Sequence, residues 1–242
     1  MKRVLLPFYI VYQYLIAWPI FALITLFTAI MTIVWMAWPN SRFIHAIQAF
    51  WSRSFFYLML LPVRVTGLEH IRPGQSYVFV SNHQSLCDVF LIYGWLPVIF
   101  KFLMKQELRK IPFVGTACAV CGHVYIDRSN PRAAVASIRK VEQTLRNGIC
   151  TVIFPEGTRT KDGRLGAFKR GAFQIAMDLK LPVIPISLTG CYDVIHKGDK
   201  FIHRVPVHMH VGEPIELSQY SPDQSAEAIA RVHAAVEAGM QG

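Results

Sequence analysis

Charged residues are scarce in this chain, and acidic residues are absent from its start. Only 17% of the 242 residues are charged, 53% are hydrophobic, and no Asp or Glu precedes Glu69. So hydrophobic a composition excludes a disordered or low-complexity protein. The length suffices for one large domain or for one domain with an appendage.

The few charges that occur are mostly positive, with a net charge of +10. Five basic residues lie in the apolar first 68 residues, and residues 101–171 hold fourteen Lys and Arg against five Asp and Glu. A nucleic-acid-binding domain gathers its positive charge, with exposed aromatics, on one soluble face. Because the charge here is split between two segments, we expect a membrane and an anionic ligand as partners, and no nucleic acid.

Cysteine is also scarce. The five cysteines are an odd number without a regular disulfide framework, which indicates a reducing compartment. Cys118 and Cys121 form a Cys-x-x-Cys pair with His123 nearby. A structural zinc site needs about four ligands, however, and no second pair follows at the right spacing. We therefore expect two buried thiols here, and for the whole chain we expect no metal and no cofactor.

A long uncharged run opens the chain. Residues 4–41 are 38 consecutive residues without a charge, whereas about 20 apolar residues span a bilayer core. A signal peptide would have an apolar region of about 7–15 residues and a small-residue cleavage site, and neither is present. We expect Pro19 to kink this helix and Ser41 to cap the next one. Since both flanks are positive, a spanning helix and a one-leaflet anchor both remain open.

A second helix is predicted over residues 43–58, where apolar side chains recur at helical spacing. Its expected apolar face consists of Phe43, Ile44, Ile47, Phe50, Trp51, Phe55 and Leu58. Arg42 and Arg53 fall largely elsewhere, so this helix would suit the membrane interface, near anionic headgroups. Residues 1–62 are thus predicted to be a hydrophobic two-helix membrane anchor.

From about residue 63 the pattern changes to short β-rich runs that alternate with helical stretches. The expected strands cover 76–81, 98–102, 123–126, 151–154, 183–188 and 205–211. The expected helices cover 86–95, 131–146, 172–179 and 223–238. Such alternation is typical of an α/β domain with a substantial sheet, which we assign to residues 63–242.

Residues 81–88, Ser-Asn-His-Gln-Ser-Leu-Cys-Asp, directly follow a predicted strand, where α/β enzymes place reactive groups. If His83 precedes the next helix and Asp88 lies in its second turn, the carboxylate can orient the imidazole and leave the other ring nitrogen as a general base. A histidine that merely caps the helix fits this stretch equally well. Cys87 could pair with His83, but the chain has no Gly-x-Ser-x-Gly motif, and activation of a substrate hydroxyl is favoured over covalent catalysis.

A second motif, Phe-Pro-Glu-Gly-Thr-Arg at 154–159, ends another strand. Gly157 allows the backbone to approach a ligand closely, and Arg159 has a planar fork suited to phosphate. Glu156 is expected to orient Arg159 or to hold a substrate hydroxyl. The glycine-rich stretch 163–171 adds three basic residues, and a solvated surface turn accounts for it quite well.

In order and spacing, five motifs resemble the phospholipid/glycerol acyltransferase family, most closely its bacterial 1-acyl-sn-glycerol-3-phosphate acyltransferases. They are Asn-His-x4-Asp at 82–88, Lys-x-Glu-Leu-x-x-Ile-Pro-x-x-Gly at 105–115, Tyr-Ile-Asp-Arg at 125–128, Phe-Pro-Glu-Gly-Thr-Arg at 154–159 and Pro-Val-Ile-Pro-Ile at 182–186. The resemblance covers the chain from about residue 65 to residue 215. It implies an α/β fold of the glycerol-3-phosphate acyltransferase type, with a mixed sheet flanked by helices.

The resemblance also implies a reaction. His83, oriented by Asp88, would take the proton from the sn-2 hydroxyl of lysophosphatidic acid. The oxygen would then attack the thioester of acyl-CoA or acyl carrier protein, giving phosphatidic acid, with amides around Gly157 stabilising the oxyanion. Arg159 and Lys105 would bind the acceptor phosphate. The full substrate-binding set that we expect is Lys105, Arg128, Glu156, Gly157, Thr158 and Arg159.

The expected location is the inner cell membrane with the active site facing the cytoplasm, because acyl thioesters are cytosolic and the odd cysteines need a reducing space. Three alternatives remain. The acceptor could be another lysolipid, such as a lysophospholipid or a lyso-aminolipid. The protein could be a thioesterase that uses water, or a non-catalytic protein that binds anionic lipids, although a binding protein needs no oriented base.

Overall fold

A computed structural model describes residues 5–35, 37–38, 41–111, 114–126, 145, 148–170, 173, 177, 181–196 and 198–241. The α-helices are α1 (Leu6–Tyr12), α2 (Trp18–Val34), α3 (Arg42–Leu58), α4 (Cys87–Trp95), α5 (Val114–Val120), α8 (Cys191–Val194) and α9 (Ser225–Gln241). The strands are β1 (Val63–Thr66), β2 (Val78–Ser81), β3 (Phe100–Lys105), β4 (Val124–Ile126), β5 (Cys150–Ile153), β6 (Val183–Thr189) and β7 (Val207–Val211). A π-helical turn covers Gln13–Ala17, and short 3₁₀ turns cover Leu68–His70, Gln106–Lys110, Leu217–Gln219 and Pro222–Gln224.

The seven strands form one mixed sheet in the order β1-β7-β6-β2-β5-β3-β4. Neighbouring strands are parallel except β6 and β7, which pair antiparallel. The predicted mixed α/β fold is therefore confirmed, and all six predicted strands are present. Sequence reasoning missed three of the described helices and strands, which are the edge strand β1 and the short helices α5 and α8. The predicted helix 131–146 and most of the predicted helix 172–179 lie outside the described residues.

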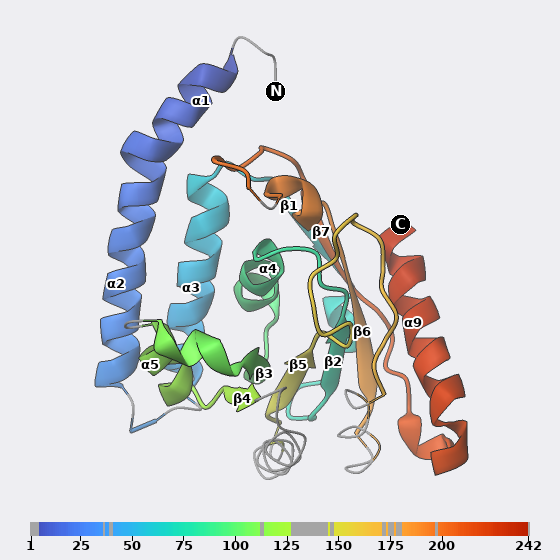
Figure 1. The fold of residues 1–242 in the computed structure, drawn as a ribbon. Helices are drawn as coiled ribbons and strands as arrows, with labels where there is room; N and C mark the ends of the chain where they lie inside the picture. The colour runs from blue at the N-terminus through green and yellow to red at the C-terminus, as the bar shows by residue number, and fades with distance from the viewer. Residues whose placement is uncertain are drawn as a thin grey trace.

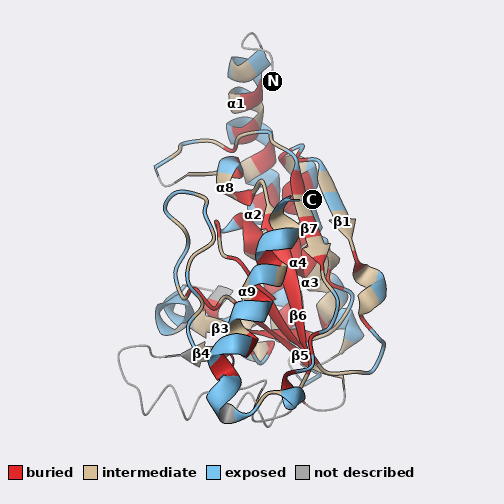
Figure 2. Cartoon of the chain, turned by 90° about the vertical axis from the view of Figure 1, so that its right-hand side faces the viewer, coloured by how far each residue is buried: buried red, intermediate tan, exposed pale blue. Residues whose placement is uncertain are grey.

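Helices cover both faces of the sheet (Figure 1). On one face lie α4 and, beyond it, α3 and α2; on the other lies α9, anchored where the Ser187 hydroxyl of β6 donates to the Val236 carbonyl at 2.7 Å. The central strands are buried on both sides, whereas α9 is exposed along its outer face (Figure 2). This explains why the strands read as continuous apolar runs while α9 reads as an amphipathic helix.

The N-terminal helix bends where its sequence predicts a kink. The π-helical turn Gln13–Ala17 ends two residues before Pro19, and the helix axis changes direction there (Figure 1). A π turn accommodates a proline because the proline ring displaces the carbonyl of the preceding turn. The predicted cap is confirmed too, since the Ser41 hydroxyl accepts a hydrogen bond from the Ile44 amide at the start of α3.

The two-helix anchor stays a prediction, and the structure gives one candidate for a membrane-crossing helix within it. Among the described residues only Leu6–Val34 is long and apolar enough to cross a membrane, with 29 residues and a mean hydropathy of 2.1. Helix α3 does not pack through a single apolar face, because α2 and α4 contact it from two sides. Two residues of the expected apolar face, Phe43 and Phe50, are exposed, whereas Ser52, which lies outside that expected face, is fully buried.

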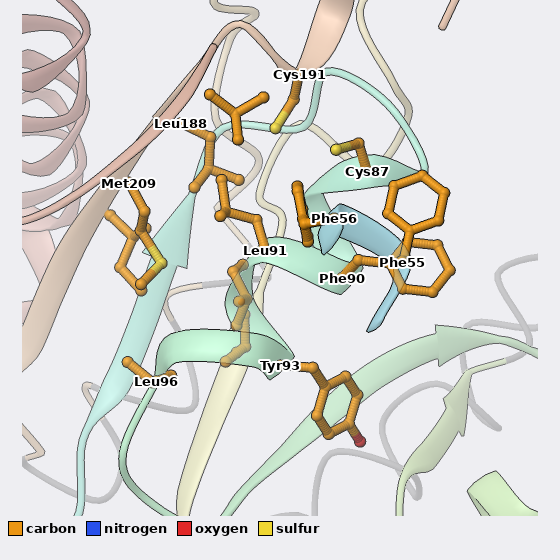
Figure 3. Close-up of a cluster of buried hydrophobic side chains, with 14 of the residues drawn as sticks. Phe55, Phe56, Cys87, Phe90, Leu91, Tyr93, Leu96, Leu188, Cys191 and Met209 are labelled. Atoms are coloured by element: carbon orange, nitrogen blue, oxygen red, sulfur yellow. The ribbon is translucent and has the colours of Figure 1, made fainter. Parts of the chain in front are cut away.

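The core continues from the sheet into α3 without a break. Phe55 stacks on Phe90 of α4 with ring centroids 4.5 Å apart, and Figure 3 shows Phe55 and Phe56 in the same buried cluster as Leu188 and Met209 of the sheet. On the far side of α3, the Trp51 indole donates to the Thr25 hydroxyl of α2 at 2.9 Å. The division at residue 62 stays a prediction, but α3 is packed as part of the α/β body.

Candidate active site

The candidate site lies where β2 ends and α4 begins. Asn82 closes the end of β2 against β6: its side-chain amide donates to the Leu188 carbonyl at 2.9 Å, and its oxygen accepts from the Leu188 amide at 2.8 Å. This double hydrogen bond fixes the backbone just before His83. Because the carboxyl ends of β2, β5 and β6 lie together at this edge of the sheet, the loops that follow them meet around His83.

His83 and Asp88 form the predicted pair. His83 Nδ1 lies 2.7 Å from Asp88 Oδ2, and the Asp88 side chain is fully buried. The same oxygen accepts hydrogen bonds from the amides of Gln84 (2.6 Å) and Ser85 (2.9 Å). Asp88 lies in the first turn of α4, not in the second as predicted, because the helix begins only at Cys87. The carboxylate thus holds both the imidazole and the turn that leads into the helix.

The His83 ring is held in place but remains accessible. It stacks on Phe154 at a centroid distance of 4.0 Å, and 19% of its side chain is exposed. With Nδ1 bonded to a carboxylate, the proton of the neutral ring lies on Nδ1 and the lone pair on Nε2. Among the described residues none hydrogen-bonds to Nε2. The ring therefore has the tautomer and the exposure of a general base.

The two nearby thiols do not have the properties of nucleophiles. Cys87 and Cys191 are buried, and their sulfur atoms face each other in the core (Figure 3). A hydrogen bond with Cys87, reinforced by burial and by the charge of Asp88, raises the pKa of Cys191 well above its ordinary value. His83 is bonded to Asp88 instead of Cys87, so the geometry disfavours the thiol–imidazole alternative.

Glu156 ties the two loops of the site together. Its Oε1 accepts the His83 amide at 2.8 Å, and its Oε2 accepts the Gly166 amide at 2.9 Å. Burial raises the pKa of this carboxyl group, although the two amide hydrogen bonds oppose the shift. Both oxygens thus serve the protein backbone. Its predicted role in substrate binding stays a prediction, whereas its positioning of His83 follows from these contacts.

The loop after β5 wraps around His83. The Thr160 amide donates to the His83 carbonyl at 2.9 Å. Gly157 has φ +75°, a conformation that favours glycine, and the Lys169 ammonium lies against it, 2.9 Å from where a Cβ would be. Lys169 is the functional candidate that sequence reasoning passed over as part of a solvated turn. Its position next to the Gly157 turn could not be read from spacing alone.

The other predicted binding residues are placed only in part. Thr158 and Arg159 are exposed on the same loop, and in the described part of the chain no carboxylate pairs with Arg159. Lys105 ends β3, but its side chain lies outside what the structure describes, and so does the whole of Arg128. The structure therefore gathers His83, Asp88, Glu156 and the 157–159 turn, and leaves the roles of Lys105 and Arg128 as predictions.

The Cys-x-x-Cys pair faces a different environment. His123 is buried, its Nδ1 accepts the Phe102 amide at 3.2 Å and its Nε2 contacts the Tyr93 hydroxyl. Burial raises the pKa of Cys118 to about 12 and that of Cys121 to about 11. Both ring nitrogens are occupied and both thiols are protonated, as expected for packing residues.

The site thus combines an oriented base with a basic loop at the carboxyl edge of a sheet, an arrangement suited to deprotonating a hydroxyl next to an anionic group. The family model described as Acyltransferase matches residues 62–189, just over half of the chain. The chain belongs to the acyltransferase family. It is an acyltransferase in fold as well: the crystal structure of the 1-acyl-sn-glycerophosphate (LPA) acyltransferase PlsC from Thermotoga maritima matches with a TM-score of 0.81 and 28% identity, covering 99% of this chain and 96% of that one.

Curated relatives of this acyltransferase come from plants and animals. A 1-acyl-sn-glycerol-3-phosphate acyltransferase of Cocos nucifera is 30% identical over 85% of this chain and 69% of its own length. The chloroplastic LPAT1 of Arabidopsis thaliana is 34% identical over 74% of this chain and 50% of its own length. The human alpha enzyme is 34% identical over 69% of this chain and 59% of its own length. The matched part thus spans between half and about two thirds of these relatives.

Proposed function

We propose that this acyltransferase transfers a fatty acyl group from an acyl thioester to the sn-2 hydroxyl of 1-acyl-sn-glycerol-3-phosphate, giving phosphatidic acid. The observation that carries the proposal is the 2.7 Å contact between His83 Nδ1 and Asp88 Oδ2, which leaves Nε2 facing outward beside a basic loop. The names of the relatives supply the acceptor: each is a 1-acyl-sn-glycerol-3-phosphate acyltransferase. Coenzyme A and acyl carrier protein both fit as carriers of the donor.

The chemical step needs one base. Nε2 of His83 takes the hydroxyl proton as the oxygen attacks the thioester carbonyl, and the buried Asp88 carboxylate stabilises the imidazolium that forms. A C–O ester bond forms, the C–S bond breaks, and the proton leaves on the released thiol. Because a thiol has a pKa of about 8.5, the thiolate departs without a strong acid, and no cofactor is required. A positioned base contributes about 10²–10⁴-fold to such a rate.

Substrate binding falls to the loop that follows β5. Arg159 can bind a phosphate monoester with two parallel hydrogen bonds, and the Lys169 ammonium adds a point charge next to Gly157. The Gly157 amide itself donates to the Phe154 carbonyl at 3.0 Å, so it is engaged in the turn. We therefore assign oxyanion stabilisation to Lys169 and to the amide that follows Gly157. Glu156 keeps this loop in register with His83.

The N-terminal helix offers the contact with the membrane. Its exposed side chains recur along one face, at Phe8, Leu15, Leu23, Phe27 and Val34. Apolar side chains that no protein covers fit the lipid phase, and Leu86, exposed three residues after His83, brings an apolar contact close to the base. We propose attachment to the inner membrane with the site facing the cytoplasm, where acyl thioesters are made.

The test measures thiol release from an acyl thioester by purified protein in vesicles, with and without 1-acyl-sn-glycerol-3-phosphate, and identifies the lipid product by mass spectrometry. We expect release that depends on the acceptor and yields phosphatidic acid. Release without any acceptor would instead indicate a thioesterase. Equal rates with choline or ethanolamine lysolipids, which lack a phosphate monoester, would favour the alternative acceptors.

A pair of arginine variants separates phosphate binding from general charge. Arg159→Ala should raise the KM for the acceptor about tenfold or more and leave the KM for the thioester unchanged, because one charge-assisted contact is worth about 1.5–3 kcal/mol. Arg164→Ala is the control, because it removes the same charge from an exposed position nearby. The Arg164 side chain lies 4.0 Å from the exposed Asp162 carboxylate. Equal effects of the two variants would show that Arg159 does not bind the phosphate.

A further inference from the structure

A cluster of two histidines and a carboxylate lies outside the active site, in the loop between α8 and β7. Asp199 Oδ2 lies 3.1 Å from His196 Nδ1 and 3.1 Å from His203 Nε2. The three side chains offer ligand atoms that all lie within 4.8 Å of one another, and each is partly exposed. Nothing in acyl transfer uses these groups.

We propose that His196, Asp199 and His203 form a binding site for a divalent transition metal of the zinc class. Imidazole and carboxylate ligands bind Zn²⁺ at about 2.0–2.2 Å, so two ligands of a tetrahedral ion lie about 3.3 Å apart. The two 3.1 Å distances to Asp199 Oδ2 match this edge. The two histidine nitrogens lie within 4.8 Å of each other, so a small rotation of one ring completes the triangle. The exposed side of the site leaves the fourth position to water.

A second carboxylate supports the assignment. Asp193 Oδ1 lies 3.7 Å from His196 Nε2, on the side of the ring that faces away from Asp199. A metal-binding histidine is typically oriented by a carboxylate or carbonyl at its other nitrogen, which fixes the tautomer and raises the basicity of the ligand. Asp193 would direct the lone pair of His196 toward the metal. The Tyr192 ring packs edge-on against His196 at 4.8 Å and holds its plane.

The loop that carries the cluster connects the N-terminal helix to the active site. Ile202 exchanges two hydrogen bonds of 2.8 Å with the Gln13 side chain, which is buried in the π-helical turn. In the other direction, the Tyr192 hydroxyl donates to the Lys161 carbonyl at 2.9 Å, two residues beyond Arg159 in the chain. A bound metal would connect His196 to His203. It would thereby make the connection between the N-terminal helix and the loop that carries Arg159 more rigid.

The sequence analysis predicted no metal site in this chain. His-x-x-Asp-x-x-x-His, at 196–203, is not a familiar ligand spacing, and only the folding of the loop on itself brings the three groups together. The inference does not depend on the proposed acyl acceptor. It concerns binding alone, so failure of the acyl-transfer assay would leave it untouched.

The test titrates tag-free, full-length protein in detergent with Co²⁺ and with Zn²⁺, following the visible absorption of Co²⁺ and the heat of Zn²⁺ binding. We expect one ion per chain, an absorption typical of tetrahedral Co²⁺, and a higher unfolding temperature with metal than without. His203→Gln should weaken binding at least tenfold. Asp193→Asn removes only the orienting carboxylate and should weaken binding about tenfold. His70→Gln, a histidine far from the loop, should bind as the wild type does.

Equal affinities in the wild type, His203→Gln and Asp193→Asn would overturn the proposal, and so would the absence of binding by the wild type. Unfolding temperatures without metal tell a lost ligand from a lost fold. If His203→Gln unfolds, the Asp193→Asn variant decides alone, because its side chain keeps its shape and makes no contact with the core.

Discussion

Two histidines of the same α/β body differ in ways that separate an imidazole placed as a general base from a structural one. His83 is partly exposed, its Nδ1 bound to a carboxylate and its Nε2 turned outward. His123 is buried, its Nδ1 held by the Phe102 amide and its Nε2 by the Tyr93 hydroxyl. Burial, reinforced by the charge of Lys101, lowers the pKa of His123 to about 3. One ring can take a proton from a substrate; the other has no free nitrogen and stays neutral.

The difference lies in the partners more than in the histidines. A buried carboxylate binds one nitrogen of His83, whereas a buried ammonium next to His123 helps to lower the pKa of that ring. Burial also lowers the pKa of Lys101, to about 8. Its ammonium donates a hydrogen bond to the Cys121 carbonyl. The two histidines therefore differ in the sign of the neighbouring charge and in whether one ring nitrogen is free to accept a proton.

Removal of the catalytic ring should have the largest effect. His83→Ala leaves no base for the acceptor hydroxyl, so we expect kcat to fall about 10²–10⁴-fold, equivalent to about 3–5 kcal/mol in the barrier. Thiol release in the presence of the acceptor measures this, and circular dichroism confirms that the fold is kept. A loss of less than tenfold in a folded variant would mean that another group is the base.

Neutralising the partner of His83 should come next. Asp88→Asn preserves the shape of the side chain, but the same oxygen accepts from His83 Nδ1 and from the Gln84 and Ser85 amides. An amide NH₂ turned toward Nδ1 loses both backbone contacts and moves the ring proton to Nε2, and an amide oxygen left in that place lacks the charge that stabilises the imidazolium. We expect kcat to fall about 10²-fold with little change in KM. Asp162→Asn, at an exposed carboxylate of the neighbouring loop, is the matched control and should change neither value. A fully active Asp88→Asn would show that the carboxylate does not set the tautomer.

The pairing of His83 with Asp88 could be predicted from the sequence because its parts are local. His83 and Asp88 are five residues apart at the end of a recognisable apolar strand. Likewise, the Ser41 hydroxyl accepts a hydrogen bond from an amide only three residues away. The strands were found for a similar reason. In a sheet buried on both faces every strand residue is apolar, so runs such as 78–81 and 183–188 are visible without knowledge of their neighbours.

What the sequence could not show depends on contacts between distant segments. Glu156 meets the His83 amide across 73 residues, and nothing in its motif tells this role from substrate binding. The burial of Ser52 could not be predicted from the helical pattern, because α2 and α4 both pack against α3. Lys169 approaches Gly157 only because the loop folds back over the turn. In each case the partner is set by the topology of the chain.

Removing the structural histidine should affect stability and leave catalysis intact. His123→Leu leaves the Phe102 amide and the Tyr93 hydroxyl without their buried partner, which costs about 1–3 kcal/mol. For a chain of this size we expect the unfolding temperature to fall by several degrees. The rate per folded molecule should stay within about twofold of the wild type. A loss of kcat as large as that of Asp88→Asn would break the distinction between the two histidines.

The smallest effect that we predict is a pH dependence of stability caused by Lys101. In the unfolded chain this lysine titrates near 10.5, and in the folded protein burial lowers its pKa to about 8. Below pH 8 both states are protonated and the folded state bears the cost of a buried charge. Between pH 8 and 10.5 the unfolded state binds more protons, so this group makes stability rise with pH.

Lys101→Met removes that contribution and isolates it from the buried thiols, which act in the opposite direction because burial raises their pKa. We expect the variant to be more stable than the wild type at pH 7, with the difference shrinking as the pH approaches 10. Denaturation midpoints at several pH values measure this difference. A constant difference across the range would mean that Lys101 keeps its ordinary pKa.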